Sequence, residues 1–468
     1  MRLPPLGVAL ATGILATACG SPDAAPTATP DPTSRRAIHA VEGLSTDSAF
    51  AGEVRDAFEH AWSGYVAHAW GHDALKPLSH GWRDWYDAPL LMTPVDGWDT
   101  MRLMGLGTQA DSAKALILTD LSFDHDMSVQ VFEVTIRLLG GLLSAYQMDG
   151  DPRWLALATD LGDRLMPAFD SPTGMPYVRV NLATGEVSDP ENNPAEIGTL
   201  TLELGQLSRL TGDSKYFDAA KRGVEQVFDR RSDLDLVGTA IDVESGEWTD
   251  STSHVSGRID SYYEYLLKSW LLFGDEDFRR MWRVSRDAID AHLAQDVDGR
   301  LWYGQVDMTS GARLGTRFGA LDAFLPAVLA LDGDTARAAR LEESVAFMWR
   351  TFGVEPESFD YTTLEMGYPA YPLRPEAIES AYYLFVLTGD ERWRDLGKDF
   401  FRRIVDATRV DDGFAHLADV RTGQQVDAME SFFLAETLKY AYLLAVPSAL
   451  DFDGVVFNTE AHPLRPTR

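Results

Sequence analysis

The hydrophobic positions of this chain follow a pattern that recurs five times. Each time, an apolar helical stretch ends in Gly-Asp, and an amphipathic stretch with helical spacing follows, as in YQMDGDPRWLALATDLGDRL at residues 146–165. The glycines of this pattern are separated by 56 to 62 residues, and they are Gly150, Gly212, Gly274, Gly333 and Gly389. The regular spacing predicts a tandem array of similar helical units.

The Gly-Asp pair is a signal for a turn between two helices. Glycine accepts the left-handed conformation that commonly ends a helix, and Asp caps the start of the next one. The spacing leaves room for one two-helix hairpin and a long return connection per unit. Leu106-Gly107 before the series, and a helix expected near Tyr440 after it, bring the total to about seven units. We therefore expect an all-α chain, built either as an open solenoid or as a closed α/α toroid.

The return connections between hairpins differ from the Gly-Asp turns in length and composition. They contain clusters of proline, aromatic and acidic residues, at 91–100, 175–198, 238–265 and 367–380. Short plain turns on one face and elaborate loops on the other are typical of a barrel that carries its chemistry on one rim. The pattern therefore favours a closed ring over a solenoid.

The chain is long and strongly acidic. Its 468 residues, 45% of them hydrophobic, carry a formal net charge of −31. This charge argues against a nucleic-acid partner, whose phosphates require basic patches, and against docking of the folded body on anionic lipid. A self-repelling, soluble surface accounts for the acidity, and a local acidic funnel that attracts a cation is the alternative. From about residue 38 onward no linker interrupts the chain, so we expect one domain over residues 38–468.

The first 19 residues have the composition of a processing segment. Arg2 precedes an apolar stretch, at 6–15, that is too short to span a membrane permanently. The sequence ATAC at 16–19 resembles the lipobox of bacterial lipoproteins, which implies lipidation of Cys19; an ordinary signal peptide with a chance cysteine is the alternative. Residues 20–37 suit a disordered tether rich in Pro, Ala and Thr. We therefore expect a lipid-anchored protein of the bacterial cell envelope, outside the cytoplasm. Because the chain has no other cysteine, its folded part has no disulfide and no thiolate metal site.

Four segments place carboxylates beside arginine or aromatic residues near expected helix starts. Glu133 and Arg137 are four residues apart, so they share one face of a helix whose other residues are mostly apolar. A buried carboxylate needs a partner or a function. Paired carboxylates in different environments are what glycosidic-bond cleavage requires, whereas structural ion pairs inside a helical toroid would give the same pattern. The four groups are Glu133 with Arg137; Arg258 and Asp260 with Tyr262 and Tyr263; Arg374 and Glu376 with Glu379; and Glu430 and Phe432 with Glu436.

These segments resemble glycoside hydrolase family 47, the class I α-mannosidases, with features of its ER degradation-enhancing mannosidase-like branch. The similar stretches include VFEVTIRLLGGLLSAY, YPLRPEAIESAYYL, MESFFLAETLKYAYLL and VFNTEAHPL, and they run in family order from about residue 61 to residue 464. The resemblance implies an (α/α)7 barrel with the C-terminal tail entering it, in agreement with the seven units inferred from the turns. It also implies removal of terminal α-1,2-linked mannose with inversion, which requires catalytic carboxyl groups roughly 6.5–9.5 Å apart.

The resemblance implies roles for individual residues. Glu133 takes the position of the general acid and Glu376 that of the general base, while Asp260 takes a third acidic position that is itself a candidate for the acid. Thr459 matches a threonine that binds calcium through its hydroxyl and carbonyl oxygens, so Ca²⁺ is the expected cofactor. We expect His462 to be structural. The positions that match substrate-binding groups are Arg137, Arg258, Arg374, Glu379, Glu430, Phe432, Glu436 and Glu196, with Glu203 as the alternative to Glu196 in the same region.

One stretch departs from the processing mannosidases. They carry a histidine where this chain has Ala320, and the stretch 319–326 is closer to the quality-control branch, so specificity beyond the first mannose is left open. Three hypotheses follow: a calcium-dependent exo-α-1,2-mannosidase, a non-catalytic mannose-binding protein on the same barrel, and an epimerase or lyase of the toroid class. Retention of the acid, base and threonine positions together favours the mannosidase. We expect a monomer that acts on mannose-containing glycans.

Overall fold

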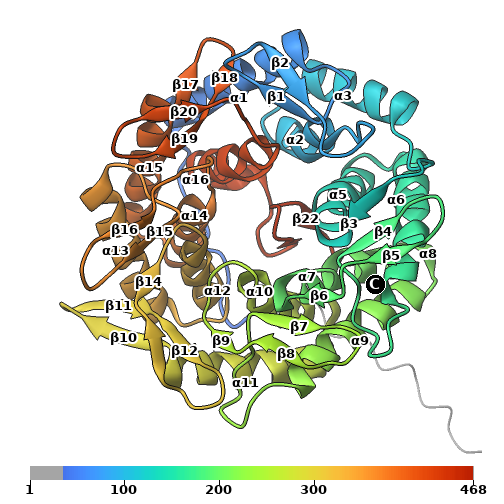
Figure 1. The fold of residues 1–468 in the computed structure, drawn as a ribbon. Coiled ribbons are helices and arrows are strands. Elements are labelled where there is room, and N and C mark those ends of the chain that lie inside the picture. The colour runs from blue at the N-terminus through green and yellow to red at the C-terminus, as the bar shows by residue number, and fades with distance from the viewer. Residues whose placement is uncertain (1–34, 467–468) are drawn as a thin grey trace, which may run out of the picture.

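The computed structural model describes residues 35–466, which form a closed ring of seven helix pairs, six of them hairpins and the seventh made by the last and first helices of the chain (Figure 1). Each pair contributes one helix to an inner layer and one to an outer layer. The inner helices are α2 (Met92–Leu103), α5 (Gly140–Asp149), α8 (Thr201–Thr211), α10 (Asp260–Phe273), α12 (Leu325–Leu331), α14 (Glu376–Thr388) and α16 (Leu438–Ala445). The outer helices are α3 (Gly107–Asp120), α6 (Pro152–Leu165), α9 (Lys215–Asp229), α11 (Glu276–His292), α13 (Thr335–Phe352), α15 (Glu391–Thr408) and α1 (Ser48–His68).

The two ends of the chain close the ring. Helix α1, the first element, packs against α16, the last inner helix, and α2 packs against the segment that leads into α16. An open solenoid would leave these first and last units apart. The predicted closed (α/α)7 barrel is therefore confirmed.

Short helical segments precede four of the inner helices. Two of them are π-helices, in which the backbone is wound more widely than in an α-helix. The segments are α4 (Val131–Glu133) with the π-helix η2 (Val134–Leu139), α7 (Pro194–Gly198), the 3₁₀-helix η4 (Leu321–Phe324) and the π-helix η5 (Phe433–Thr437). Two further 3₁₀-helices, η3 (Met166–Phe169) and η6 (Pro447–Ala449), follow α6 and α16.

The Gly-Asp pairs occupy the turns predicted for them. Gly150 ends α5 with φ 76°, a conformation that favours glycine, and the Asp151 carboxylate accepts a hydrogen bond from the Arg153 N–H at the start of α6, at 3.1 Å. The same arrangement recurs where α8, α10 and α14 end. Gly333 differs slightly, because α12 ends two residues earlier and the glycine lies inside the turn.

The long return connections contain small antiparallel sheets that the sequence did not predict. Each three-stranded sheet joins strands from two successive connections, so neighbouring units are linked around the rim. The three-stranded sheets are β3 (Ser128–Gln130), β4 (Arg179–Asn181) and β5 (Val187–Ser188); β6 (Glu191–Asn192), β7 (Ala240–Asp242) and β8 (Trp248–Asp250); β9 (Thr252–Ser253), β12 (Gln305–Asp307) and β13 (Arg313–Gly315); and β14 (Arg317–Phe318), β15 (Ser358–Asp360) and β16 (Met366–Tyr368). The two-stranded sheets are β1 (Ala74–Lys76) with β2 (Gly81–Arg83), β10 (Ala294–Val297) with β11 (Arg300–Tyr303), β17 (Arg409–Val410) with β18 (Gly413–Phe414), β19 (His416–Asp419) with β20 (Gln424–Val426), and β21 (Val456–Phe457) with β22 (Pro463–Leu464).

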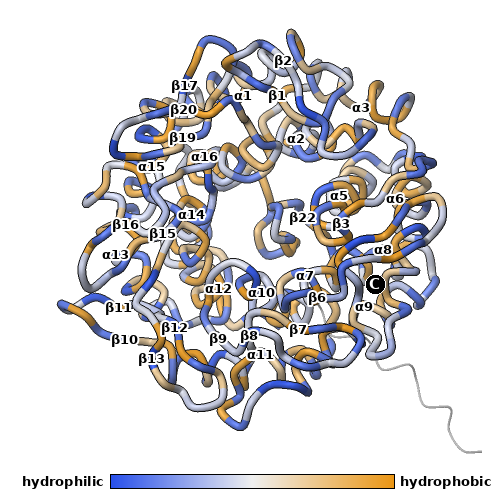
Figure 2. Tube along the Cα trace, viewed as in Figure 1, coloured by the Kyte–Doolittle hydropathy of each residue, from blue (hydrophilic) through white to orange (hydrophobic). Residues whose placement is uncertain are grey.

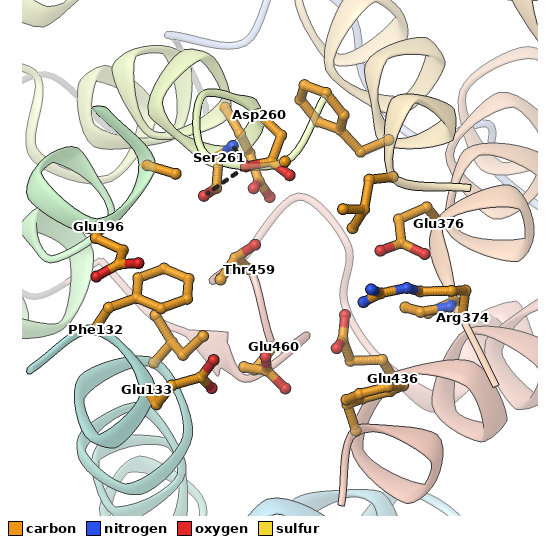
Figure 3. Close-up of a pocket in the computed structure, with 18 of the residues that line it drawn as sticks. Phe132, Glu133, Glu196, Asp260, Ser261, Arg374, Glu376, Glu436, Thr459 and Glu460 are labelled. Atoms are coloured by element: carbon orange, nitrogen blue, oxygen red, sulfur yellow. Dashed lines mark hydrogen bonds between the residues drawn. The ribbon is translucent and has the colours of Figure 1, made fainter. Parts of the chain in front are cut away.

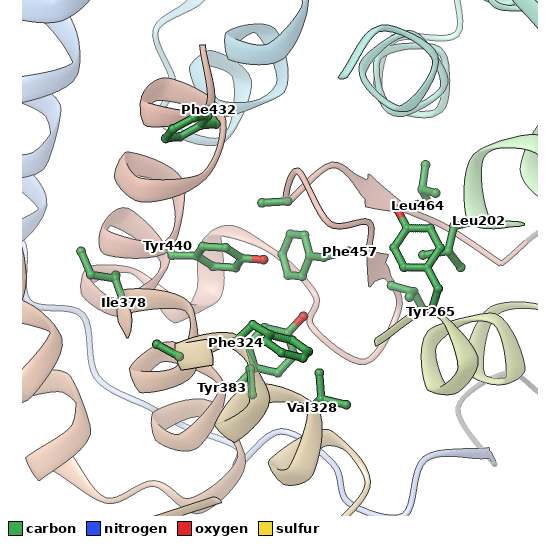
Figure 4. Packing of buried hydrophobic residues seen from close by; sticks show 14 of the residues in the cluster. Leu202, Tyr265, Phe324, Val328, Ile378, Tyr383, Phe432, Tyr440, Phe457 and Leu464 are labelled. Atoms are coloured by element: carbon green, nitrogen blue, oxygen red, sulfur yellow. The ribbon is translucent and has the colours of Figure 1, made fainter. Parts of the chain in front are cut away.

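Apolar side chains fill the space between the helix layers and one end of the ring. The inner helices carry long hydrophobic stretches, whereas polar residues are frequent in the exposed loops (Figure 2). The C-terminal hairpin β21–β22 lies inside the ring, as expected, and Phe457 packs against Tyr440 with ring centroids 5.7 Å apart (Figure 4). Tyr382 and Tyr383 complete this aromatic cluster. The cluster forms a floor, so the axial space above it is closed at one end.

The N-terminal part of the described chain covers the same end. The Arg36 guanidinium is buried and donates hydrogen bonds to the carbonyl oxygens of Phe452 and Val455. Arg36 lies near the end of the segment predicted as a tether, residues 20–37, and it contacts the folded body. The predicted signal segment, Cys19 and most of the tether lie outside the described residues. Within residues 35–466, no helix is both long and apolar enough to cross a membrane.

Candidate active site

A cavity of about 220 Å³ lies on the axis of the ring, above the C-terminal hairpin (Figure 3). The inner helices begin around it, because the long connections deliver the chain to this face of the ring. Eight carboxylates and three arginines line it. All but one of the substrate-binding, catalytic and metal-binding residues predicted from the sequence are among the lining residues: Glu133, Arg137, Glu196, Arg258, Asp260, Arg374, Glu376, Glu379, Phe432, Glu436 and Thr459.

Glu133 and Arg137 form the predicted ion pair, although the helix between them is not regular. Arg137 Nε lies 2.8 Å from Glu133 Oε2, across the start of the π-helix η2. The Arg137 side chain is only 7% exposed, and its Nη1 also lies 2.5 Å from Glu460 Oε2. A charge buried to this degree is favourable only where partners compensate it. Arg137 is therefore held between a carboxylate of the first half of the chain and one of the C-terminal hairpin.

Asp260 is the first residue of α10 and points into the cavity (Figure 3). Its Oδ1 accepts a hydrogen bond from the Ser261 N–H at 2.8 Å. Burial raises the pKa of Asp260 to about 6, against that hydrogen bond, because the charged form loses its hydration. A carboxyl group with such a pKa can exchange a proton near neutral pH.

Glu376 begins α14 directly after Arg374 and Pro375. Its Oε2 is buried and makes no hydrogen bond within the described residues. Burial raises the pKa of Glu376 to about 8, and the nearby Arg374 guanidinium opposes this shift. Arg374 is itself fixed by two hydrogen bonds to Glu357, at 2.8 and 3.1 Å. The structure therefore places one free carboxylate oxygen of Glu376 in the cavity beside a rigidly held cation.

Thr459 lies at the tip of the C-terminal hairpin, at the centre of the cavity floor (Figure 3). Its N–H donates a hydrogen bond to the Tyr265 hydroxyl at 3.1 Å, and this hydroxyl donates to Glu203 at 2.6 Å. Glu203 is fully buried and supports the hairpin through Tyr265. Of the two alternatives, Glu196 and Glu203, it is Glu196 that lines the cavity.

The floor around Thr459 holds more negative charge than the protein compensates. Glu379 and Glu460 have pKa values raised to about 7 by burial, and the pKa of Glu436 is also raised well above its usual range by burial and by the neighbouring Glu460 and Glu376. Lys268 forms an ion pair with Glu264 and lies 3.9 Å from Glu379, so a single positive charge compensates two carboxylates. Crowded carboxylates around the hydroxyl and carbonyl oxygens of Thr459 are an all-oxygen donor set, which suits a hard divalent cation.

Glu430 does not lie where the resemblance implied. It forms an ion pair with Arg83 at 2.6 Å and lines an adjoining outer pocket of about 500 Å³, together with Trp85 and His416. The reason is local: Glu430 precedes the turn into η5, whereas Phe432 and Glu436 follow it and face the axis. Phe432 lines both pockets, with the guanidinium groups of Arg137 and Arg374 5.6 and 5.8 Å from its ring centre.

The structure adds site residues that sequence reasoning missed. Glu264 lines the cavity one helical turn after Asp260 on α10, and Glu460 follows Thr459 directly. Both positions could have been found, the first from its i+4 spacing and the second from its place in VFNTEAHPL. His462 is structural, as predicted: it is fully buried, and its ring nitrogens lie 2.8 Å from Asp99 and 3.3 Å from Asp96.

Comparisons with known proteins agree with this architecture. Residues 57–466 match glycosyl hydrolase family 47. Alpha-mannosidase I MNS4 of Arabidopsis thaliana is 41% identical over 436 residues, which cover 88% of this chain and 69% of that protein. The Homo sapiens endoplasmic reticulum mannosyl-oligosaccharide 1,2-alpha-mannosidase is 37% identical and is matched over 88% of this chain and 63% of its own length.

Solved structures give the same result. The alpha-1,2-mannosidase from Trichoderma reesei superimposes with a TM-score of 0.84 at 29% identity, covering 90% of this chain and 100% of that one. A cellobiose 2-epimerase from Spirochaeta thermophila, with a TM-score of 0.52 and 14% identity, shares the fold alone. The resemblance inferred from the sequence is therefore confirmed: the chain belongs to glycosyl hydrolase family 47 and is a glycoside hydrolase of the α-1,2-mannosidase class.

Proposed function

We propose that the protein is a calcium-dependent, inverting exo-α-1,2-mannosidase that removes terminal α-1,2-linked mannose from glycans. The observation that carries the proposal is the convergence of Glu133, Asp260 and Glu376 on one axial cavity whose floor is Thr459. The aromatic cluster around Phe457 closes one end of the axial space, so a sugar can enter the cavity only from the opposite end, at the rim. An enclosed pocket of this kind accepts a chain end and excludes the middle of a glycan, which is exo action.

Glu376 is the proposed general base. Inversion requires a carboxylate that deprotonates a water molecule on the face of the sugar opposite the leaving group. Glu376 offers a buried oxygen with no hydrogen-bond partner among the described residues, and such an oxygen is free to accept the water proton. Arg374, held by Glu357, opposes the rise that burial causes in the pKa of Glu376, to about 8, so the ionised form that this step needs becomes more populated as pH rises toward 8.

Glu133 and Asp260 are the two candidates for the general acid. Both residues line the cavity, and Figure 3 shows them on other sides of it than Glu376. Glu133 ends α4, and Asp260 begins α10. Protonated Asp260 is well populated near pH 6, which suits a proton donor. Glu133 is held by Arg137 and can act directly or through a water molecule. Activity of Glu133→Gln and Asp260→Asn on a substrate with an acidic leaving group separates them, because only the variant lacking the acid is rescued by that substrate.

The residues at the floor fit Ca²⁺. The Thr459 hydroxyl and carbonyl oxygens would hold the ion, and Glu264, Glu379, Glu436 and Glu460 would bind the water molecules around it. A bound calcium ion supplies positive charge that orients sugar hydroxyl groups and offsets the crowded carboxylates. The chain's own contribution is a rigid hairpin, tied to the barrel wall through Arg137 and Tyr265, that fixes the threonine on the axis.

Release of mannose from defined disaccharides tests the proposal. We expect hydrolysis of α-1,2-mannobiose but not of α-1,3- or α-1,6-mannobiose, loss of activity in a chelator, and recovery with Ca²⁺. Binding of mannose without any release would instead support the mannose-binding protein. Hydrolysis that persists in the chelator would contradict the metal assignment. Among the described residues no histidine lines the cavity, which favours neither an epimerase nor a lyase.

We also propose that the protein is a monomer attached to the bacterial cell envelope by lipid on Cys19, outside the cytoplasm. The support is the ATAC sequence at 16–19, after a short apolar stretch. Metabolic labelling with a fatty acid should mark the wild-type chain and not the Cys19→Ala variant. Unlabelled wild-type protein in the soluble extracytoplasmic fraction would contradict the anchor, and a mass above one chain in light scattering would contradict the monomer.

A further inference from the structure

Two histidines converge on one carboxylate outside the catalytic cavity. His68 is the last residue of α1, His80 lies in the turn between β1 and β2, and Asp412 lies in the turn between β17 and β18. His68 Nε2 is 3.3 Å and His80 Nδ1 is 2.6 Å from Asp412 Oδ2. The three atoms all lie within 4.8 Å of one another, and none of these residues lines the catalytic cavity.

The sequence builds this approach into helix α1. Gly64 lies one helical turn before His68, and a Cβ atom at this position would be 2.0 Å from the carbonyl oxygen of Asp412. Only glycine therefore lets the β17–β18 turn lie against the helix. One turn earlier again, His60 Nε2 lies 2.8 Å from the Val410 carbonyl oxygen and fixes the same hairpin. The face of α1 formed by residues 60, 64 and 68 thus holds Asp412 beside His68.

The spacing of the donor atoms fits a tetrahedral metal ion. Ligand atoms at about 2.0–2.1 Å from Zn²⁺ are roughly 3.3 Å apart when the geometry is tetrahedral. The separation of His68 Nε2 from Asp412 Oδ2 has this value, and His80 Nδ1 would need to withdraw from Asp412 by less than about 1 Å. The two histidine nitrogens, which lie within 4.8 Å of each other, would need to settle at the same spacing. His80 can do so, because its side chain is 52% exposed on a turn.

The chemistry of the donors selects the class of ion. Two imidazole nitrogens with one carboxylate oxygen suit zinc and its neighbours in the transition series, whereas calcium prefers oxygen ligands alone. Among residues 35–466, the polar partner of both His68 Nε2 and His80 Nδ1 is the Asp412 carboxylate, which would itself be the third ligand of the ion. The partial exposure of all three side chains leaves room for a water molecule as the fourth ligand.

We propose that His68, His80 and Asp412 form a binding site for a transition-metal dication of the Zn²⁺ class. The ion would link α1 and the β1–β2 hairpin, from the start of the folded chain, to the β17–β18 hairpin near its end. These segments meet where the ring closes, so the bound ion would cross-link the first and last parts of the barrel. The site is separate from the catalytic cavity and does not depend on the proposed mannosidase activity.

Calorimetric titration of the purified protein with Zn²⁺, in millimolar Ca²⁺ so that the cavity is filled, tests the site. We expect one zinc ion per chain and a rise of a few degrees in Tm on binding. His68→Ala and His80→Asn should each weaken zinc binding at least tenfold; asparagine is chosen because it tolerates the positive φ of 54° at residue 80. His39→Ala is the matched control, since His39 Nδ1 lies the same 3.3 Å from a carboxylate oxygen of Asp453 but, among the described residues, is not part of a three-ligand cluster.

Cobalt gives a second readout that does not depend on heats of binding. Co²⁺ in a tetrahedral site has visible absorption bands, which we expect for the wild type and the His39→Ala variant and not for Asp412→Asn. The proposal is overturned if zinc does not bind saturably, or if His68→Ala and His80→Asn bind it as tightly as the wild type. Far-ultraviolet circular dichroism in the absence of zinc establishes that the variants are folded.

Discussion

Arg137 and Glu460 are 323 positions apart in the chain, yet their side chains form an ion pair of 2.5 Å in the wall of the cavity. This pair joins the second hairpin unit to the C-terminal hairpin and so holds Thr459 on the axis of the ring. It also shows how the fold serves the site. The ring supplies the walls, and a separate segment inserted from below supplies the floor.

Removal of the Arg137 charge should destabilise the protein strongly. In Arg137→Met, Glu460 and Glu133 lose their buried partner, and an uncompensated buried charge costs about 3–5 kcal/mol. The free energy of unfolding in urea measures this loss. Arg402→Met is the control, because Arg402 pairs with Glu53 at the surface and its loss should cost less than about 1 kcal/mol. Equal losses in the two variants would show that Arg137 is not a structural link.

Replacement of the proposed base should separate binding from turnover. Glu376→Gln keeps the shape of the side chain but removes the group that accepts the water proton, so kcat should fall about 100-fold or more while mannose still binds. Steady-state kinetics and calorimetry with mannose measure the two quantities. Glu365→Gln, at an exposed position outside the cavity, should leave both unchanged. Turnover near the wild-type rate in Glu376→Gln would remove Glu376 from the mechanism.

The crowded floor predicts how stability depends on pH without calcium. Burial raises the pKa of Glu376 to about 8 and those of Glu379 and Glu460 to about 7, above the values of the unfolded chain. The folded state therefore binds more protons than the unfolded state between about pH 5 and 8, so stability should fall as pH rises through this window. Calcium should offset the fall, because it compensates the charges that form.

Thermal unfolding in chelator and in calcium, at pH 5.5 and pH 8, measures this effect. We expect the gain in Tm from Ca²⁺ to be larger at pH 8 than at pH 5.5. A gain that is the same at both values of pH would mean that calcium binds away from these carboxylates.

The threonine at the floor should control affinity for the metal ion. Thr459→Ala removes the hydroxyl oxygen and keeps the carbonyl, so calcium affinity should fall at least tenfold and activity with it. Thr459→Ser restores the hydroxyl and should restore most of both. Calcium titrations followed by Tm and by mannose release provide the comparison. If the alanine variant needs no more calcium than the wild type, Thr459 is not a ligand.

Much of the fold could be predicted from local signals. Gly150 and Asp151 show why: a glycine with positive φ and a capping aspartate mark a turn between helices whatever surrounds them. Five repetitions of that signal, with one unit before them and one after, led to the expected number of about seven units. Closure of the ring depended on contacts between α1 and α16, far apart in sequence, so it was only favoured by the sequence and had to be established by the structure.

The candidate site was predictable where chemistry is carried by short sequences. Glu133, Asp260 and Glu376 could be found because each lies next to an arginine or an aromatic residue at a helix start. Glu430 was misplaced because it precedes η5 and forms an ion pair with Arg83, 347 positions away, which holds it in the outer pocket and which no local spacing reveals. Glu203 likewise faces Tyr265 and Asn458 through tertiary packing.

We propose that Glu376 and an opposing acid act on a mannose held over Thr459, and the configuration of the released sugar is the strongest test of this proposal. Proton NMR of α-1,2-mannobiose with the enzyme and Ca²⁺ follows the anomeric signals from the first minutes. We expect β-mannose to appear first and to equilibrate slowly with the α form, because water attacks from the face opposite the leaving group. Release of α-mannose first, or no release in calcium, would contradict the account.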